Sequence, residues 1–351
     1  MKAASITVTL ASIIFTSLIG CVKDPTTAAP EIPLPSAKGV YIINEGNFGR
    51  ANASLSYYDL ESFRVYNDVF TAVNGKSLGD VAAGMGILGN EGFIIVNNSQ
   101  KIEIIDLQTN LESGTIATGP GSSPRQMAFV RDSLALVTDL YGNQVLKVRL
   151  RSRSVIGAIP VGDNPEGIAI ANGKAYIANS GFGAGKTVSV ISLATMAVVA
   201  TIPVTDNPNG VQVTPAGFVY VVCAGSYGDF ANPDDDTPAK VMVIDPSMDA
   251  VVDSILLGGH AMNIAIGLDG IGYVASTSEV LRIDTRIHRV TGQFKSGSYY
   301  SVGVESASGD VYLSDPKSFV QPGTVYVYAA NGQLRNQFDT GLIPGSFAFK
   351  R

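Results

Sequence analysis

The sequence predicts an all-β protein, a seven-bladed β-propeller in which each blade is a sheet of four antiparallel strands. The first observation behind this prediction is a repeat. The segment DNPEGIAIANGKAYIAN, starting at Asp163, returns 43 residues later as DNPNGVQVTPAGFVYVV, starting at Asp206. A fixed period of about 20–50 residues is typical of repeat architectures. The second observation is composition, because 46% of the 351 residues are apolar, 15% are charged and 38 are glycine. This balance favours many short strands joined by tight turns.

The number of repeats follows from one hydrophobic run that recurs in every unit. The seven runs are marked by Asp59, Asp106, Arg149, Ser192, Asp245, Asp284 and Ala329. Their spacing averages about 45 residues, so residues 39–351 hold about seven units. Four strands in about 45 residues predict a propeller blade. Runs such as residues 241–244 are apolar throughout, which suits a sheet packed between two neighbouring blades.

The third observation is the position of the last repeat copy. The motif that opens the first strand of a unit occurs at residues 124–127, 165–168 and 208–211, and its last copy occupies residues 344–349. The first unit, which begins at Gly39, lacks such a strand. We therefore expect the C-terminal segment to form the innermost strand of blade one and to close the ring, so that no strand edge is left unpaired there.

The N-terminal residues are expected to lie outside the propeller. An apolar run from Ile6 to Ile19 is too short for a membrane span and reads as a signal peptide over residues 1–20. The sequence LIGC, ending at Cys21, resembles the bacterial lipobox, and this resemblance implies that Cys21 is lipidated. The alternative is an ordinary signal peptide followed by an incidental cysteine. Residues 21–38 contain four prolines and predict an extended tether.

The propeller sequence also resembles known families. The pattern DNPEGIAI…KAYIANS…VSVISLAT…VVATIPV is similar to YncE-type and lactonase-like seven-bladed propellers. The opening segment YIINEGNFGRANASLSYYDLES resembles a narrower group, the surface-displayed propeller lipoproteins of Gram-negative bacteria. Some members of that group capture cobalamin and pass it to an outer-membrane transporter. The resemblance implies an outer-membrane lipoprotein that faces the cell exterior, with the periplasmic side as the alternative.

One face of the propeller is predicted to bind ligands. In a four-stranded antiparallel blade, the loop before the first strand and the loop between the second and third strands emerge on the same face. The predicted loops between second and third strands are rich in glycine and aromatic residues, and they span residues 45–52, 139–143, 180–185, 224–240 and 315–323. Aromatic side chains on such loops suit an amphipathic ligand. The alternative is that Phe48, Phe182 and Phe230 only cover the interior of their loops.

Residues just inside the first strands are expected to point toward the mouth of the central channel. They include Arg125, Glu166, Asn209, Met262, Tyr300 and Gly345. Together with the loops, they give a predicted set of ligand contacts: Asn47, Phe48, Arg125, Tyr141, Asn143, Glu166, Asn179, Phe182, Asn209, Tyr227, Phe230, His260, Tyr299, Tyr300 and Phe319. The asparagines and Arg125 would hydrogen-bond to amide or phosphate groups of the ligand.

The sequence shows no catalytic centre and no cofactor site. The only histidines are His260 and His288, and neither has a second histidine or a cysteine at metal-ligand spacing. His260 would contact the ligand, with a solvated loop histidine as the alternative, whereas His288 is expected to be a solvated turn residue. The acidic loop that contains Asp229, Asp234 and Asp236 has oxygen ligands for calcium, with a solvated loop as the alternative. Cys223 follows an apolar run and is expected to be a buried, inert thiol.

Three functions remain open on the sequence. A net charge of −6 without a basic cluster argues against nucleic acid as a partner. The first function is capture of an amphipathic small molecule, with a corrinoid as the candidate ligand and an outer-membrane transporter as the candidate partner. The second is a surface scaffold that binds a protein or a glycan. A lactonase-like enzyme ranks third.

Overall fold

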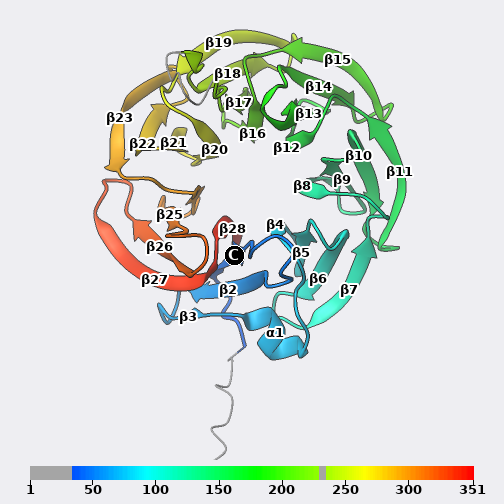
Figure 1. Ribbon diagram of the computed structural model, residues 1–351, viewed down its shortest axis with the longest axis vertical. Helices are drawn as coiled ribbons and strands as arrows, with labels where there is room; N and C mark the ends of the chain where they lie inside the picture. The colour runs from blue at the N-terminus through cyan, green and yellow to red at the C-terminus, as the bar shows by residue number, and fades with distance from the viewer. Residues whose placement is uncertain (1–33, 229–234) are drawn as a thin grey trace, which may run out of the picture. The chain divides into compact units, whose positions relative to one another are not determined.

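The computed structural model describes residues 34–228 and 235–351. The predicted signal peptide, Cys21, most of the predicted tether, Phe230, Asp229 and Asp234 lie outside the described residues. The described residues form seven sheets of four antiparallel strands, as the sequence predicts. The sheets are arranged as blades in a ring, with one strand of each blade innermost (Figure 1).

The bounds of the strands, from the innermost to the outermost strand of each blade, are as follows. Blade 1 contains β28 (Pro344–Lys350), β1 (Gly39–Asn44), β2 (Ser54–Asp59) and β3 (Val65–Tyr66). Blade 2 contains β4 (Ala82–Leu88), β5 (Glu91–Val96), β6 (Lys101–Asp106) and β7 (Glu112–Ala117). Blade 3 contains β8 (Pro124–Arg131), β9 (Leu134–Asp139), β10 (Gln144–Arg149) and β11 (Ser154–Pro160). Blade 4 contains β12 (Pro165–Ala171), β13 (Lys174–Asn179), β14 (Thr187–Ser192) and β15 (Ala197–Pro203).

The remaining blades follow the same order. Blade 5 contains β16 (Pro208–Val213), β17 (Val219–Cys223), β18 (Lys240–Asp245) and β19 (Ala250–Leu256). Blade 6 contains β20 (Ala261–Ile266), β21 (Ile271–Ser276), β22 (Glu279–Asp284) and β23 (Arg289–Ser296). Blade 7 contains β24 (Ser301–Val304), β25 (Val311–Asp315), β26 (Pro322–Tyr328) and β27 (Leu334–Leu342). A short helix α1 (Val69–Asn74) follows β3, and a 3₁₀ turn η1 (Gly181–Gly183) follows β13.

The ring is closed by the C-terminal strand. β28 pairs antiparallel with β1, in a register that places Gly39 opposite Lys350 and Ile42 opposite Phe347. β1 therefore has a hydrogen-bonded neighbour on each side, β28 and β2, and all six of its residues are buried. The prediction that the C-terminal segment forms the innermost strand of blade one is confirmed.

Apolar side chains fill the space between neighbouring blades. One cluster joins blades 4 and 5 and includes Tyr176, Val190, Val221 and Ile244, all fully buried. Both faces of the middle strands are buried in this way, which explains why their sequences are apolar throughout rather than alternating. Cys223 belongs to the same cluster and is fully buried, and burial raises the pKa of its thiol to about 11. An inert thiol is expected in such an environment.

Polar contacts also join neighbouring blades in a repeated way. A tyrosine is the second or third residue of a blade's second strand in several blades, and in three of them its hydroxyl contacts a left-handed residue in the outer turn of the next blade. The pairs are Tyr41 with Asn110 (2.7 Å), Tyr176 with Asp249 (2.6 Å) and Tyr220 with His288. His288 also packs edge-on against Phe218. It lies in the predicted turn between β22 and β23, but it is half-buried rather than fully solvated.

The two faces of the ring differ in their connections. We call one the loop face; it carries the connections between second and third strands, such as residues 45–53, 140–143 and 180–186. The opposite face, the turn face, carries the short hairpins between first and second strands, such as residues 89–90 and 172–173. The chain enters β1 from the turn face. There the Lys350 ammonium donates hydrogen bonds to the carbonyls of Ser36 (2.6 Å) and Leu107 (2.7 Å). In the part of the chain that the structure describes, no helix has the length and apolar character needed to span a membrane.

Candidate functional site

A cavity of about 700 Å³ lies at the centre of the loop face. It is lined by the first residues of the innermost strands and by the loops that surround them, and every blade contributes at least one residue. This volume is within the range of small-molecule binding sites. The cavity is therefore the candidate site.

Eight of the predicted contact residues line this cavity. They are Arg125, Glu166, Asn209, Tyr227, His260, Tyr299, Tyr300 and Phe319. Most of them occupy the start of an innermost strand or the connection before it, where the repeat motif placed them. Gly345, at the equivalent position of blade 1, also lines the cavity.

The other predicted residues that the structure describes lie elsewhere. Phe48, Tyr141 and Phe182 project from the loop face outside the cavity lining and are 70%, 58% and 68% exposed, so they do not cover the interior of their loops. Asn143 is also exposed, and Asn47 donates a hydrogen bond to the carbonyl of Phe319 (2.8 Å).

Asn179 is not presented to a ligand, contrary to the sequence interpretation. It is 1% exposed, and its amide donates to the hydroxyls of Thr187 and Ser189 on the adjacent strand, both at 3.0 Å. Asn44 makes the equivalent contacts in blade 1, with Ser54 and Ser56. The repetition of this arrangement indicates that both asparagines hold the ends of two strands together.

A group of ionisable side chains forms one wall of the cavity. The Arg125 guanidinium pairs with the Glu166 carboxylate at 2.7 Å, and the Tyr300 hydroxyl donates to the Glu45 carboxylate at 3.1 Å. Glu45 and Glu166 both interact electrostatically with Arg125. Two carboxylates therefore share one guanidinium. The sequence interpretation included residue 45 in a loop but did not single out its carboxylate.

The environment shifts the pKa values of this group. Burial raises the pKa of Glu45, and the nearby Glu166 adds to this effect, whereas Arg125 and the hydrogen bond from Tyr300 oppose it. Burial acts to lower the pKa of Arg125, but the two carboxylates outweigh it and raise that pKa, so the guanidinium stays charged. Arg125 therefore remains positively charged between the carboxylates of Glu45 and Glu166.

Glycine at position 345 makes room for Glu45. A Cβ atom at Gly345 would lie 2.2 Å from Oε1 of Glu45 and 2.7 Å from its Cγ. In blades 3 and 4 the equivalent positions hold Arg125 and Glu166 on the strand itself. In blade 1 the side chain of Glu45, from the neighbouring loop, occupies that place instead.

We expect Gly345→Ala to displace the Glu45 carboxylate and break its hydrogen bond with Tyr300. Because the clash involves a flexible side chain, unfolding free energy is expected to change by no more than about 1 kcal/mol. Moving Glu45 toward solvent would lower its raised pKa toward the ordinary value, which ¹³C NMR titration measures. Gly84→Ala is the matched control, since its Cβ would meet only the Ser346 hydroxyl, at 3.9 Å. An unchanged pKa of Glu45 in Gly345→Ala would contradict this account.

Aromatic rings line the cavity beside this group and across from the first residues of other blades, and Tyr300 belongs to both sets. Tyr300 and Phe319 meet edge-to-face with their centroids 5.7 Å apart, and Tyr227 stacks on His260 at 3.7 Å. Tyr300 and Phe319 are each more than one-third exposed toward the cavity and its rim. Such rings offer apolar faces to a ligand at low entropic cost.

His260 is engaged through both of its ring nitrogens. Nδ1 lies 3.0 Å from the carbonyl oxygen of Ala224, and Nε2 lies 3.5 Å from a carboxylate oxygen of Asp236. A metal bound by His260 would have to displace one of these contacts. Within residues 34–228 and 235–351, no cluster of three His, Cys, Asp or Glu residues is arranged to hold a metal ion.

Neutral polar groups complete the lining. The side chains of Gln126, Asn207, Asn209, Gln212 and Asn263 line the cavity, and Asn209 donates to the side-chain oxygen of Asn207 at 2.7 Å. The cavity thus combines aromatic surface, neutral hydrogen-bonding groups and several charged side chains. This combination suits a ligand with an apolar body and a few polar substituents.

One pentapeptide has the spacing of a hydrolase nucleophile, G-x-S-x-G, at residues 75–79. Ser77 lies between α1 and β4, and its hydroxyl donates to the carbonyl of Ala51 at 2.8 Å. A nucleophile elbow requires a sharp turn from a strand into a helix, which this loop does not form. Ser77 is therefore not assigned a catalytic role.

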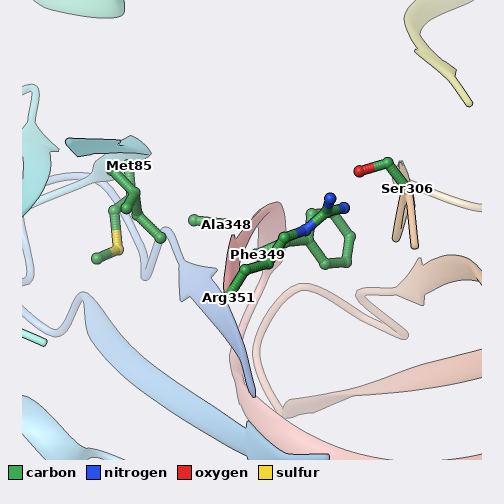
Figure 2. Close-up of a pocket in the computed structure, with 6 residues that line it drawn as sticks. Met85, Ser306, Ala348, Phe349 and Arg351 are labelled. Atoms are coloured by element: carbon green, nitrogen blue, oxygen red, sulfur yellow. The ribbon is translucent and has the colours of Figure 1, made fainter. Parts of the chain in front are cut away.

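A second, smaller cavity of about 320 Å³ lies at the turn face (Figure 2). It is lined by Met85, Ile87, Ser306, Ala348, Phe349 and Arg351. Arg351, its charged lining residue, is paired with Glu305 at 2.9 Å. The loop-face cavity is larger and has many more polar groups, and it is the stronger candidate.

Comparison with known proteins agrees with the fold. Residues 38–232 match the protein family described as Domain of unknown function (DUF5074). A quinonprotein alcohol dehydrogenase-like protein from Bacteroides thetaiotaomicron is 14% identical, with a TM-score of 0.66, over 90% of this chain and 79% of that chain. A functionally unknown protein from Desulfotomaculum acetoxidans is 14% identical, with a TM-score of 0.66, over 90% of this chain and 99% of that chain.

Hydrazine synthase from Kuenenia stuttgartiensis is 19% identical, with a TM-score of 0.62, over 76% of this chain and 88% of that chain. No curated protein sequence matches the chain significantly. At these identities the similar structures show the propeller fold and not a shared activity.

Proposed function

Since the chain belongs to the family described as Domain of unknown function (DUF5074), which names no activity, we propose that its propeller binds an amphipathic small molecule in the loop-face cavity. The observation that carries the proposal is the composition of this cavity. Its lining combines aromatic rings, amide side chains and the Glu45, Arg125 and Glu166 group, and Tyr300 contacts Glu45. A flat apolar ligand would stack on the rings while its polar substituents bind the amides.

The sharper form of the proposal is a corrinoid-capturing lipoprotein. Its support is the sequence resemblance of residues 41–62 to surface-displayed propeller lipoproteins and the lipobox-like LIGC ending at Cys21. The cavity is open to solvent, so a large corrinoid would insert one edge and rest the remainder on the rim. An outer-membrane transporter would then receive the ligand from this face.

Isothermal titration calorimetry with cyanocobalamin and with cobinamide tests the corrinoid proposal. Binding of either compound, together with a ligand-dependent rise in melting temperature, would support it. Asn209→Ala is expected to weaken binding, and Asn331→Ala is the matched control because Asn331 is not among the residues that line the cavity. Absence of heat and of any melting shift at saturating corrinoid would remove the corrinoid as ligand.

A second candidate function, a surface scaffold, is favoured by one observation. The rings of Tyr141 and Phe182 lie 6.0 Å apart on the loop face, and both are more than half exposed. Exposed aromatic residues are enriched where proteins bind partners. The double variant Tyr141→Ser/Phe182→Ser would lose partner binding while it retains small-molecule binding in the cavity. If the double variant instead lost small-molecule binding, Tyr141 and Phe182 would belong to the same binding site as the cavity.

A further inference from the structure

We propose that the loop-face cavity selects amphiphiles that carry a cationic group, such as a protonated amine, and that Glu45 receives this group. The inference rests on the proposed function, because it names the class of ligand for the same cavity. It follows from the charges of the lining residues, their pairing, and the position of the aromatic rings.

The described residues that line the cavity carry a surplus of negative charge. The carboxylates are Glu45, Glu166 and Asp315, and the basic groups are Arg125 and Lys317. Both basic groups already have anionic partners, because Arg125 pairs with Glu166 at 2.7 Å and Lys317 pairs with Asp339 at 3.0 Å. A ligand anion would therefore meet carboxylates without a free cation to offset them.

Glu45 and Asp315 are the two described lining carboxylates that form no ion pair, and Glu45 is the one that lies beside Arg125 and Tyr300. Among the described residues, Tyr300 is the only side chain that donates a hydrogen bond to the Glu45 carboxylate. Glu166 has the direct ion pair with Arg125, so Glu45 receives only the weaker, longer-range attraction of that guanidinium. Burial raises the pKa of Glu45, and the attraction of Arg125 and the hydrogen bond from Tyr300 do not offset this effect. A cation placed at Glu45 would supply the missing counter-charge.

The neighbouring rings suit a cation with an apolar body. The Tyr300 hydroxyl contacts Glu45, and the Tyr300 ring meets the Phe319 ring edge-to-face. Both rings line the cavity. An ammonium near an aromatic face is attracted by the electron density of the ring. The apolar part of the ligand would lie along Tyr300 and Phe319 while its ammonium reaches the Glu45 carboxylate.

This inference changes the role that the sequence suggested for Arg125. The sequence interpretation assigned Arg125 to a phosphate or amide group of the ligand. In the structure, the guanidinium is neutralised by Glu166 and attracted by Glu45, so it is poorly placed to bind phosphate. Arg125 instead orients Glu166 and reduces the electrostatic repulsion between the carboxylates of Glu45 and Glu166.

Three naphthalene probes that share the ring and differ in the charge of one substituent test the inference: 2-naphthylmethylamine, 2-naphthalenemethanol and 2-naphthoate. With the full chain at pH 7, we expect the amine to bind about tenfold more tightly than the alcohol, and the naphthoate to bind most weakly. Glu45→Gln should reduce amine affinity to that of the alcohol without changing alcohol affinity. Glu279→Gln, which removes an equal charge outside the cavity lining, should leave all three affinities unchanged.

A pH series provides a second measurement. The titratable and charged groups that face Glu45 are Arg125, Glu166 and Tyr300. Because the pKa of Glu45 is raised, its carboxylate becomes neutral at a higher pH than an ordinary glutamate. Amine affinity in the unaltered protein should therefore fall as pH decreases from 7, while the amine itself remains charged. Glu45→Gln should abolish most of this dependence.

The possible results separate the inference from the proposed function. Equal affinity for the three probes would overturn selection of cations but leave amphiphile binding intact. Tighter binding of naphthoate than of the amine would also overturn it. If none of the probes bound, the cavity would not be an amphiphile site, and both proposals would fail.

Discussion

Deletion of residues 344–351 is expected to prevent the protein from forming a stable ring. The deletion removes β28, the innermost strand of blade 1, and exposes the edge of β1, whose residues are all buried. Phe347 and Phe349 of β28 also pack on Tyr312 of blade 7, at centroid distances of 5.8 and 5.4 Å. Losing these contacts removes more than about 5 kcal/mol, which is comparable to the whole stability of a typical domain.

Circular dichroism, thermal melting and size-exclusion chromatography measure this effect. The control is a rearranged chain in which residues 344–351 precede Gly39 through a short turn, since Lys350 and Gly39 are paired neighbours. This chain restores the hairpin that other blades have between first and second strands, and it should melt close to the unaltered protein. A truncated protein that melts within a few degrees of the full chain would show that β28 is dispensable.

Tyr300→Ala is expected to cause the largest loss of ligand affinity, about 10- to 30-fold for 2-naphthylmethylamine. The substitution removes an aromatic wall of the cavity, its contact with Phe319, and the hydrogen bond to Glu45. Tyr300→Phe keeps the ring and removes only the hydroxyl, so a smaller loss of about threefold to tenfold is expected. Fluorescence titration of the naphthalene probe measures both values.

Comparing Tyr300→Ala with Tyr300→Phe separates two contributions to ligand affinity. One is stacking on the Tyr300 ring, and the other is the hydrogen bond by which the Tyr300 hydroxyl positions Glu45. The melting temperature should change little in either variant, because Tyr300 is 37% exposed. The alcohol probe should lose affinity in Tyr300→Ala but hardly in Tyr300→Phe. Equal affinity of all three proteins for the amine would place the ligand away from Tyr300 and would contradict the proposed position of the cavity site.

The fold could be predicted from the sequence because every blade must meet the same packing requirement, and this requirement produces the repeat. A blade cannot bury both of its faces alone, so each unit needs the same apolar strands and the same turns. The copy at residues 344–349 could be placed in blade 1 because the unit beginning at Gly39 lacked a first strand. The outer polar contacts, such as Tyr176 with Asp249, could not be predicted, since they join residues of different blades.

The candidate site could be predicted only where it follows the repeat. Arg125, Glu166 and Asn209 occupy the same position of three consecutive units, so their common location was visible in the alignment of repeats. Glu45 was missed because it reaches the site from a loop and fills the space above Gly345. Asn179 was misplaced because a buried strand end and an exposed loop start look alike in sequence. Its equivalence to Asn44, with the same hydroxyl partners, was the signal of a structural role.

Ser36 is held at the turn face, where its carbonyl accepts a hydrogen bond from the Lys350 ammonium. The larger cavity opens on the opposite, loop face. The described residues that precede β1 therefore lie away from the mouth of this cavity, and a ligand can enter it without displacing them.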